Sequence, residues 1–233
     1  GGFAQITKDL FVKKLSLGAA LRIDKADYFE AKFTPQFTVV YSPKETLNFR
    51  TSYQNGYRFP SIFEGFSNVN SGGVKRVGGL RIMSDGIFEN SYTKASIDKF
   101  QAQVNNDVNT LGITQVAAIE KNKNTIQKNP YTYLEPEFVK SLEVGFRGMA
   151  LNKNLFIDAD FYYNSYKNFI AQVEASIPNT NDPNLIPTAL YSKSTQNRYR
   201  LWTNSKSKIY NYGGSLGFKY KLNQTFTALT NVT

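Results

Sequence analysis

The 233-residue chain contains no histidine and no cysteine. Without cysteine it can form no disulfide framework and offers no thiol nucleophile. Without histidine it lacks the commonest general base, the usual metal ligand and every Ser-His or Cys-His catalytic pair. A zinc site built from Asp and Glu alone would be unusual. We therefore expect no enzyme, no catalytic residue, no metal site and no cofactor.

Long apolar runs are also missing from the sequence. No stretch of 18 apolar residues occurs, so we expect no transmembrane helix. The chain begins Gly-Gly-Phe, without the charged and apolar regions of a signal peptide. Residues 226–233 stop in the middle of a strand-like alternation. Both ends resemble cuts, and we expect an internal fragment of a longer protein.

Positive charge and aromatic side chains are abundant. The 28 Lys and Arg residues outnumber 18 Asp and Glu, and aromatic residues make up 15% of the chain, which favours β structure. The charge is typical of a solvated basic surface, or of attraction to an anionic membrane surface. No RNA-binding or zinc-finger motif accompanies it, so we expect no nucleic-acid partner.

Residues 46–54 alternate strictly between two kinds of side chain. In the run L-N-F-R-T-S-Y-Q, the odd positions 47–53 are mostly apolar and the even positions 48–54 are polar. This pattern predicts a strand with one apolar and one polar face. Similar alternation predicts about seven strands in all, at 14–24, 31–41, 46–54, 139–150, 155–164, 210–222 and 226–232. Pro35 predicts a bulge in the second of them, and residues 42–45 predict a tight turn.

Two long segments interrupt the strand pattern. Residues 56–138 lack it for about eighty residues, far beyond ordinary loop lengths. Within them, apolar residues at helical spacing in 97–108 and the stretch 114–121 predict two short helices. We expect these apolar side chains to pack the loop against itself, and we prefer this to a partner-binding helix. Residues 178–198 predict another irregular loop.

The connections alternate between tight turns and long segments. This layout is typical of a transmembrane β-barrel with short periplasmic turns and long extracellular loops. Strands of 10 to 12 residues with one apolar face fit a tilted crossing of the bilayer. A soluble β-sandwich would alternate too, so the strands alone leave both folds open, and the eighty-residue loop favours the barrel. We predict an all-β fold, an antiparallel transmembrane β-barrel segment with long extracellular loops, one containing short helices.

The polar faces of two consecutive strands make a register prediction. Polar side chains fall on odd positions in 139–150 and on even positions in 155–164. Residues paired on a shared face must then sum to an odd number, which excludes a three-residue loop at 152–154 and leads us to expect a two-residue loop. The predicted ladder of opposite charges on this face, turned to the lumen, comprises Arg50, Glu143, Arg147, Asp158 and Asp160. In a wet lumen each pair is worth about 0 to 1 kcal/mol.

The two carboxylates of this ladder have a competing interpretation. Asp158 and Asp160 flank Ala159 on one face, and glycosidases use paired carboxylates. Their expected position opposite Arg147 on a barrel wall makes ion pairing the preferred interpretation.

Three motifs then carry a family resemblance. Residues 48–61 read N-F-R-T-S-Y-Q-N-G-Y-R-F-P-S, with Glu64 following. Residues 134–137 read L-E-P-E, 141–146 read S-L-E-V-G-F, and 158–170 read D-A-D-F-Y-Y-N-S-Y-K-N-F-I. In this order they resemble the barrel signatures R-x-S-Y-x-x-G-Y-R-x-P, L-x-P-E with S-x-E-x-G, and Y-x-x-x-Y-x-N-x-I of TonB-dependent outer-membrane receptors. The distance between the first two resembles members of the Bacteroidetes type.

The resemblance implies a twenty-two-stranded barrel in the cell outer membrane, closed by a plug domain. It implies import of siderophores, cobalamin, glycans or similar solutes with energy delivered through TonB. Residues 1–233 would then be a partial barrel domain, lacking plug and final strands, with 56–138 as a large extracellular loop. The implied partners are the TonB complex, the plug domain, outer-membrane lipid, lipopolysaccharide and the solute, and whether a surface lipoprotein covers the barrel stays open. The alternative is a passive porin or a structural or adhesive barrel.

Such a transporter works by binding and gating, so its ligand contacts belong in the loops. The candidate ligand-binding residues are Tyr57, Arg58, Phe63, Phe66, Arg76 and Arg81. For Arg58 and Glu64 we favour a role in holding the base of the loop. A further basic run comprises Lys193, Arg198, Arg200, Lys206 and Lys208. It fits either lipopolysaccharide phosphates or a solvated face, and Trp202 with Tyr199 is a candidate marker of the outer membrane interface.

Overall fold

The computed structural model describes residues 1–233. The chain divides into two compact units, and each is described by itself. The sheet unit comprises Gly1–Phe59, Pro136–Phe169 and Lys206–Thr233. The insert unit comprises Pro60–Glu135 and Ile170–Ser205. The long segments that lack the strand pattern thus fold into a unit of their own.

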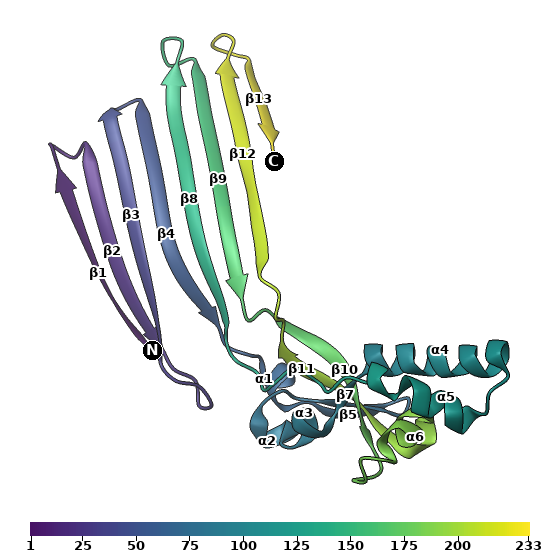
Figure 1. Cartoon of the computed structure of the whole chain (residues 1–233). Coiled ribbons are helices and arrows are strands. Elements are labelled where there is room, and N and C mark those ends of the chain that lie inside the picture. The colour runs from purple at the N-terminus through teal and green to yellow at the C-terminus, as the bar shows by residue number, and fades with distance from the viewer. The chain divides into compact units, whose positions relative to one another are not determined.

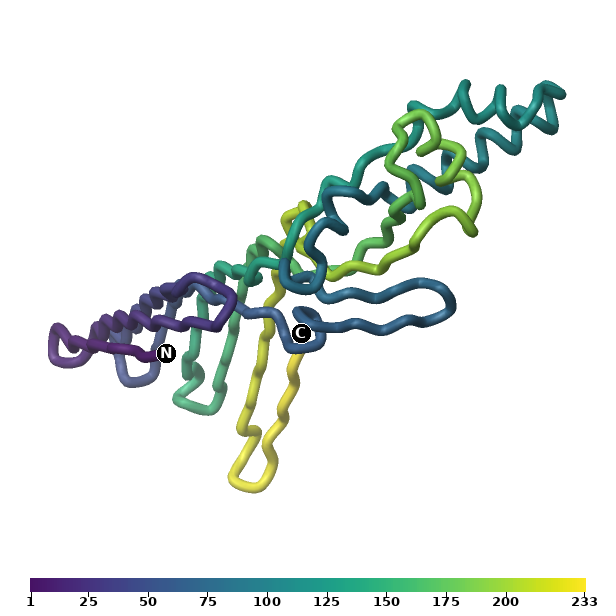
Figure 2. The backbone as a smooth tube through the Cα atoms, turned by 90° about the horizontal axis from the view of Figure 1, so that it is seen from below, coloured from purple at the N-terminus to yellow at the C-terminus, as the bar shows by residue number.

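The sheet unit is a single antiparallel sheet of eight strands, with β1 and β13 at its open edges (Figure 1). Strands adjacent along the chain of this unit are adjacent in the sheet, and Figure 2 shows them folding back on one another as hairpins. Their order is β1 (Gly2–Leu10), β2 (Leu15–Asp24), β3 (Lys32–Lys44), β4 (Leu47–Arg58), β8 (Glu137–Ala150), β9 (Leu155–Lys167), β12 (Ile209–Lys221) and β13 (Thr227–Val232).

The register places most of the apolar side chains of the sheet unit on one face. A single row of paired residues crosses the whole sheet and is apolar throughout: Leu10, Leu15, Tyr41, Phe49, Phe146, Ala159, Leu216 and Val232. Neighbouring rings touch along it, with the Phe49 and Phe146 centroids 5.2 Å apart. The alternation that defines each strand therefore adds up to one continuous apolar surface.

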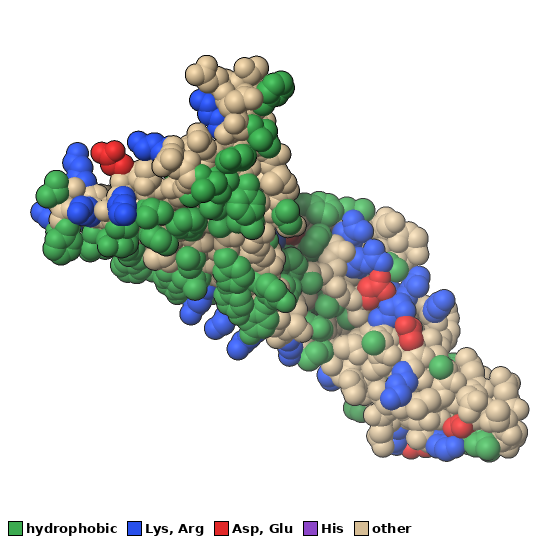
Figure 3. Space-filling view, turned by 90° about the horizontal axis from the view of Figure 1, so that it is seen from above, with side chains coloured by type: hydrophobic (Ala, Val, Ile, Leu, Met, Phe, Trp, Pro, Cys, Tyr) green, Lys and Arg blue, Asp and Glu red, His purple; other side chains and the backbone are tan.

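No second layer covers this apolar face. Every buried hydrophobic side chain lies in the insert unit, whereas large apolar residues of the sheet unit such as Phe37, Val144 and Phe161 are about half exposed. The space-filling view shows many hydrophobic side chains gathered on the surface (Figure 3). A β-sandwich would bury such a face against another sheet, so the pattern of burial favours the barrel wall over the sandwich.

The insert unit contains a five-stranded sheet and six α-helices. Its strand order is β5 (Asn68–Ser71), β6 (Val74–Val77), β11 (Gln196–Asn204), β10 (Ile170–Pro178) and β7 (Tyr92–Thr93). Its helices are α1 (Ile62–Phe66), α2 (Arg81–Ser84), α3 (Ile87–Asn90), α4 (Lys94–Leu111), α5 (Gln115–Asn122) and α6 (Ile186–Tyr191), with 3-10 turns at Lys123–Thr125 and Lys193–Thr195. No helix of the protein is both long and apolar enough to cross a membrane.

Two small cores hold the insert unit together. One contains Val77, Phe88, Ala175 and Leu201, and the other contains Phe100, Val104, Ala118 and Ile119. The second core is the apolar stripe of α4 packed on α5, which confirms that the apolar residues at helical spacing pack the loop against itself. The hydroxyl of Thr93 caps the start of α4, and Gly112 in the left-handed conformation ends it.

The hairpin between β8 and β9 confirms the register rule but not the loop length. Arg147 pairs with Asp158 and Ala150 with Leu155, and both sums are odd as expected. The expected two-residue loop is wrong, because residues 151–154 form a four-residue loop in which Leu151, Asn152 and Lys153 have positive φ. Two- and four-residue loops satisfy the same parity, so the face pattern cannot choose between them.

The expected bulge at Pro35 is also wrong. Pro35 pairs in regular register with Leu21 of β2, and the irregularity of β3 lies between Tyr41 and Lys44. Pairing of β3 with β4 stops at Gln36. Proline has no N–H to donate to a neighbouring strand. It is tolerated at position 35 because β3 pairs there with β2 alone.

Several element bounds differ from the pattern-based prediction. β1 was not predicted, so the sheet has eight strands instead of about seven. β3 continues through 42–44, and the tight turn consists of residues 45–46 alone. The irregular loop at 178–198 contains α6 and the start of β11, and the 56–138 segment is shorter because β4 runs to Arg58 and β8 begins at Glu137. The first helix, with 18 residues, is not short.

Candidate ligand-binding surface

The polar face of the sheet unit carries a network of charges on three adjacent strands. Arg147 of β8 lies directly opposite Asp158 of β9, and its Nη2 is 2.7 Å from Asp158 Oδ2. Arg50 of β4 forms an ion pair with Asp160, and its Nη2 is 3.7 Å from Asp158 Oδ1. Both carboxylates are therefore engaged by arginine, as the ion-pair interpretation expects.

Glu143 does not join this network. It lies on the same face, opposite Ser52 and Tyr162, but its exposed side chain forms no ion pair. Four of the five charged residues are thus brought together. The sequence pattern could place Glu143 on the face, but only the register shows that no cation lies opposite it.

Two of the candidate loop residues belong to strand β4. Arg58 forms a bidentate pair with Glu137 of β8, at 2.6 Å from Nε and 3.0 Å from Nη2, and Glu137 is only 8% exposed. The Tyr57 ring packs on Phe138, with centroids 4.8 Å apart, and the Lys32 ammonium lies 5.6 Å from the Tyr57 ring centroid. These contacts join the ends of β4 and β8.

The start of the insert unit is defined by a capping box. Ser61 accepts a hydrogen bond from the Glu64 backbone N–H, and the Glu64 carboxylate accepts one at 2.7 Å from the Ser61 N–H. Glu64 therefore caps the first turn of helix α1, which begins at Ile62.

Phe63 and Arg76 come together in the insert unit, with Trp202 as a third member. The Phe63 and Trp202 rings meet edge to face with centroids 6.1 Å apart, and the Arg76 guanidinium lies 5.9 Å from the Phe63 ring centroid. Phe63 is half exposed, and the buried Trp202 Nε1 makes no hydrogen bond. We call Phe63, Arg76 and Trp202 the aromatic cluster. Sequence reasoning considered Trp202 only as an interface marker, and the contact with Phe63 across 139 positions left no local signal.

Arg81 lies in a different part of the insert unit. Its Nε is 3.1 Å from Asp85, and its guanidinium lies 5.4 Å from the ring centroid of Tyr133. Tyr133 donates a hydrogen bond to Glu89 at 2.5 Å, and desolvation together with this bond raises the pKa of Tyr133 to about 12. The carboxylate of Asp85 raises the pKa of Arg81. Phe66 ends α1 and is partly exposed. Among the candidates of the insert unit, Phe63 and Arg76 contact each other, whereas Arg81 contacts Tyr133 and Asp85.

The basic run at 193–208 is divided between the two units. Lys206 and Lys208 belong to the sheet unit, whereas Lys193, Arg198 and Arg200 belong to the insert unit. Strand alternation places Arg198, Arg200 and Trp202 on one face of β11, where Arg200 lies opposite Arg76 of β6 and Glu174 of β10. Arg200 forms an ion pair with Glu174, so the charge of this member of the basic run is compensated within the insert unit.

One family accounts for the wall, the insert and the motifs together. The sequence profile described as TonB dependent receptor-like, beta-barrel matches residues 1–233. The chain belongs to this family of receptors and transporters, which are not enzymes. It is therefore a segment of an outer-membrane β-barrel. The orientation of its apolar face toward lipid and of its polar face toward the lumen stays a prediction. Its Bacteroidetes type stays a prediction.

Solved structures of a siderophore receptor, a hemophore receptor and an iron transporter share the fold. The siderophore receptor PirA from Pseudomonas aeruginosa aligns with a TM-score of 0.55 at 15% identity, over 98% of this chain and 30% of that one. The Serratia marcescens hemophore receptor HasR, a double mutant in complex with HasA and heme, aligns with a TM-score of 0.51 at 15% identity. The alignment covers 94% of this chain and 31% of HasR. The FrpB iron transporter from Neisseria meningitidis, in its F5-1 apoprotein form, aligns with a TM-score of 0.51 at 14% identity. The alignment covers 98% of this chain and 24% of FrpB.

The receptor segment spans less than a third of each of these structures. At such low identities the likeness shows the fold alone. No curated protein matches the chain. No group of three or more acidic side chains lies close enough together to hold a metal ion.

Proposed function

We propose that this segment is part of an outer-membrane active transporter that binds a solute and imports it with TonB-coupled energy. The observation that carries the proposal is the two-faced wall: an apolar row crosses all eight strands, and an arginine–aspartate network occupies the opposite face. The partners are the plug domain, the TonB complex, outer-membrane lipid and lipopolysaccharide.

The insert unit provides the solute-binding surface in this proposal. We place it, with the 56–138 segment, on the extracellular side. The aromatic cluster supports this role because it combines a half-exposed ring with a guanidinium that forms no ion pair. Aromatic and arginine side chains dominate the energetics of recognition surfaces. The pair Arg58–Glu137 holds the wall together and is not part of the ligand surface.

The class of solute is also part of the proposal. The structures that share the fold are named for siderophores, a hemophore with heme, and iron. We therefore rank an iron-carrying solute first, ahead of cobalamin and glycans.

The test uses the full-length receptor in a deletion strain grown with single iron sources. We expect growth to need both the receptor and TonB, and Phe63→Ala or Arg76→Gln to reduce uptake at limiting solute while leaving the amount of folded receptor unchanged. Lys123→Gln is the matched control, because it also removes one exposed positive charge from the insert unit. Uptake that persists without TonB would instead support the passive porin.

A further inference from the structure

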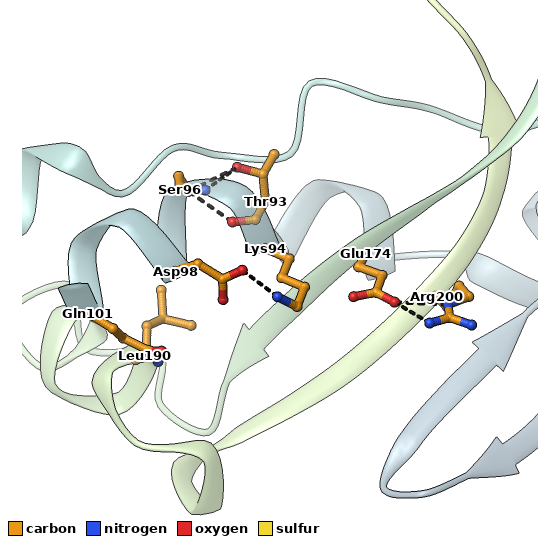
Figure 4. A network of polar contacts seen from close by, with 8 residues as sticks. All are labelled: Thr93, Lys94, Ser96, Asp98, Gln101, Glu174, Leu190 and Arg200. Carbon is orange, nitrogen blue, oxygen red and sulfur yellow. Dashed lines mark hydrogen bonds and ion pairs between the residues drawn. The ribbon is translucent and has the colours of Figure 1, made fainter.

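A small cavity of about 190 Å³ lies inside the insert unit, between the first turns of α4 and one face of its sheet. Five charged residues line it: Lys94, Asp98, Glu174, Lys193 and Arg198. Figure 4 shows Lys94 and Asp98 on α4 facing the strands that carry Glu174 and Arg200. None of these residues belongs to the aromatic cluster.

Both acids of the cavity are already neutralised. Asp98 pairs with Lys94 one helical turn away, and Glu174 pairs with Arg200 of the neighbouring strand (Figure 4). Lys193 and Arg198 form no ion pair. The lining therefore carries two positive charges that no carboxylate of the chain compensates.

Arg198 lies on a sheet face that carries other positive charges. It shares a face of β11 with Arg200, which lies directly opposite Arg76 on β6. Three arginines thus share one sheet face with a single carboxylate, Glu174, and like charges at neighbouring sheet positions are destabilising. The Arg198 guanidinium lies beside Gly73, where a Cβ would be 3.1 Å from its Nη2. A bound anion would relieve this repulsion.

A hydroxyl group also lines the cavity. Ser176 is the cross-strand partner of Arg198 and is 4% exposed, and its hydroxyl forms no hydrogen bond within the chain. The hydroxyl oxygen is not sealed from solvent, so it can donate to a ligand in the cavity. The two glutamines in the lining differ, because Gln101 and Gln196 both donate to the Leu190 carbonyl, at 2.9 and 3.1 Å, and so hold α6 in place.

We propose that this cavity binds a small oxyanion, which the Arg198 guanidinium, the Lys193 ammonium and the Ser176 hydroxyl hold together. A phosphate dianion matches the two uncompensated charges, and guanidinium groups are well suited to phosphate and carboxylate oxygens. The buried side chain of Ile97 adds an apolar wall that suits a short hydrocarbon body. Binding here is separate from import, so it can succeed or fail independently of the proposed transport function.

The experiment measures binding to the detergent-solubilised full-length receptor by titration calorimetry. The probes are inorganic phosphate and butyrate, which separate a phosphate site from a carboxylate site. We expect at least one of them to bind, and Arg198→Gln to weaken it by about tenfold or more, because hydrogen bonds to charged groups contribute about 1.5–3 kcal/mol. Ser176→Ala should weaken binding less, and the control Lys123→Gln should leave it unchanged.

The rate of limited proteolysis within the insert unit reports whether each variant keeps its fold. If Arg198→Gln is digested faster than the parent, the smaller change Ser176→Ala decides the question. Absence of binding by both probes overturns the proposal. Equal binding by the parent chain and by the folded variants at Arg198 and Ser176 overturns it too.

Discussion

Arg50 of β4 forms its ion pair with Asp160 of β9 across the intervening strand, at the position of Gly145. The three residues are paired in one row of the sheet. A Cβ at Gly145 would lie 2.6 Å from Asp160 Oδ1 and closer still to Arg50 Nε. The absence of a side chain on β8 is therefore what lets the two charges meet, and it gives the glycine of the S-L-E-V-G-F motif a physical reason.

Gly145→Ala should separate this pair and destabilise the barrel wall. The added methyl group meets side-chain atoms on both sides, and such overpacking costs about 1–3 kcal/mol. The measurement is the urea midpoint of the full-length receptor in lipid vesicles. Gly2→Ala is the control, since no atom lies within 4 Å of its added Cβ. Equal midpoints for the two variants would contradict the steric account.

A new positive charge should cost much more stability on the apolar face of β8 than on its polar face. Glu143 and Val144 are consecutive in β8, with Val144 on the apolar face and Glu143 on the polar face. Val144→Lys should destabilise the folded receptor by about 2–4 kcal/mol if the site lies near mid-membrane depth, because the ammonium must enter lipid. Glu143→Lys should change stability by less than about 1 kcal/mol. The heat-dependent shift in gel mobility of the folded barrel reports both, and a larger cost at Glu143 would reverse the assignment of the faces.

Tyr133 should make stability fall at high pH. Its pKa is raised to about 12 by desolvation and by the hydrogen bond to Glu89, so folding favours the protonated phenol. The stabilising contribution is complete below the usual pKa of about 10 and is lost as the pH rises toward 12. Comparing the unfolding of the parent chain with that of Tyr133→Phe isolates this contribution from the lysines. The difference in unfolding free energy should shrink from pH 10 to pH 12, and a difference that is constant over this range would refute the assignment.

Phe100 should be the most sensitive position of the α4–α5 core. It is fully buried, in contact with Val104, Ala118 and Ile119. Phe100→Ala should lower the unfolding free energy of the insert unit by about 3–5 kcal/mol through lost burial and a cavity. Ile62→Ala, at an 82% exposed position, is the matched apolar control. Proteolysis of the insert unit, followed over time, should accelerate only for Phe100→Ala.

Much of the wall was predictable because strand alternation is a local property. The odd and even positions of β4, β8 and β9 assigned Arg50, Arg147, Asp158 and Asp160 to one face before any strand was paired. The same pattern left loop length undetermined at 151–154, since parity is shared by loops of two and four residues. The pattern also missed β1, because Lys8 interrupts its apolar positions and is itself the residue that pairs with Leu17.

Only two of the six helices of the insert unit, α4 and α5, were predicted from the sequence. The spacing of Ile97, Phe100, Val104 and Val108 indicated α4, because a helix shows its buried face within one segment. The parallel pairing of β6 with β11 joins residues more than 120 positions apart, and neither short strand has a pattern of its own. The aromatic cluster and the cavity at Arg198 depend on that pairing.

The amino-acid sequence by itself determined the two-faced strands, the charges of the polar face and the family, because each of these is written in local order and spacing. The tertiary structure alone decided which charges meet. Arg50 reaches Asp160 only because Gly145 lies between them, and Arg198 stays without a carboxylate only because Glu174 pairs with Arg200. Such outcomes depend on the register of strands distant in sequence, and no local pattern records that register.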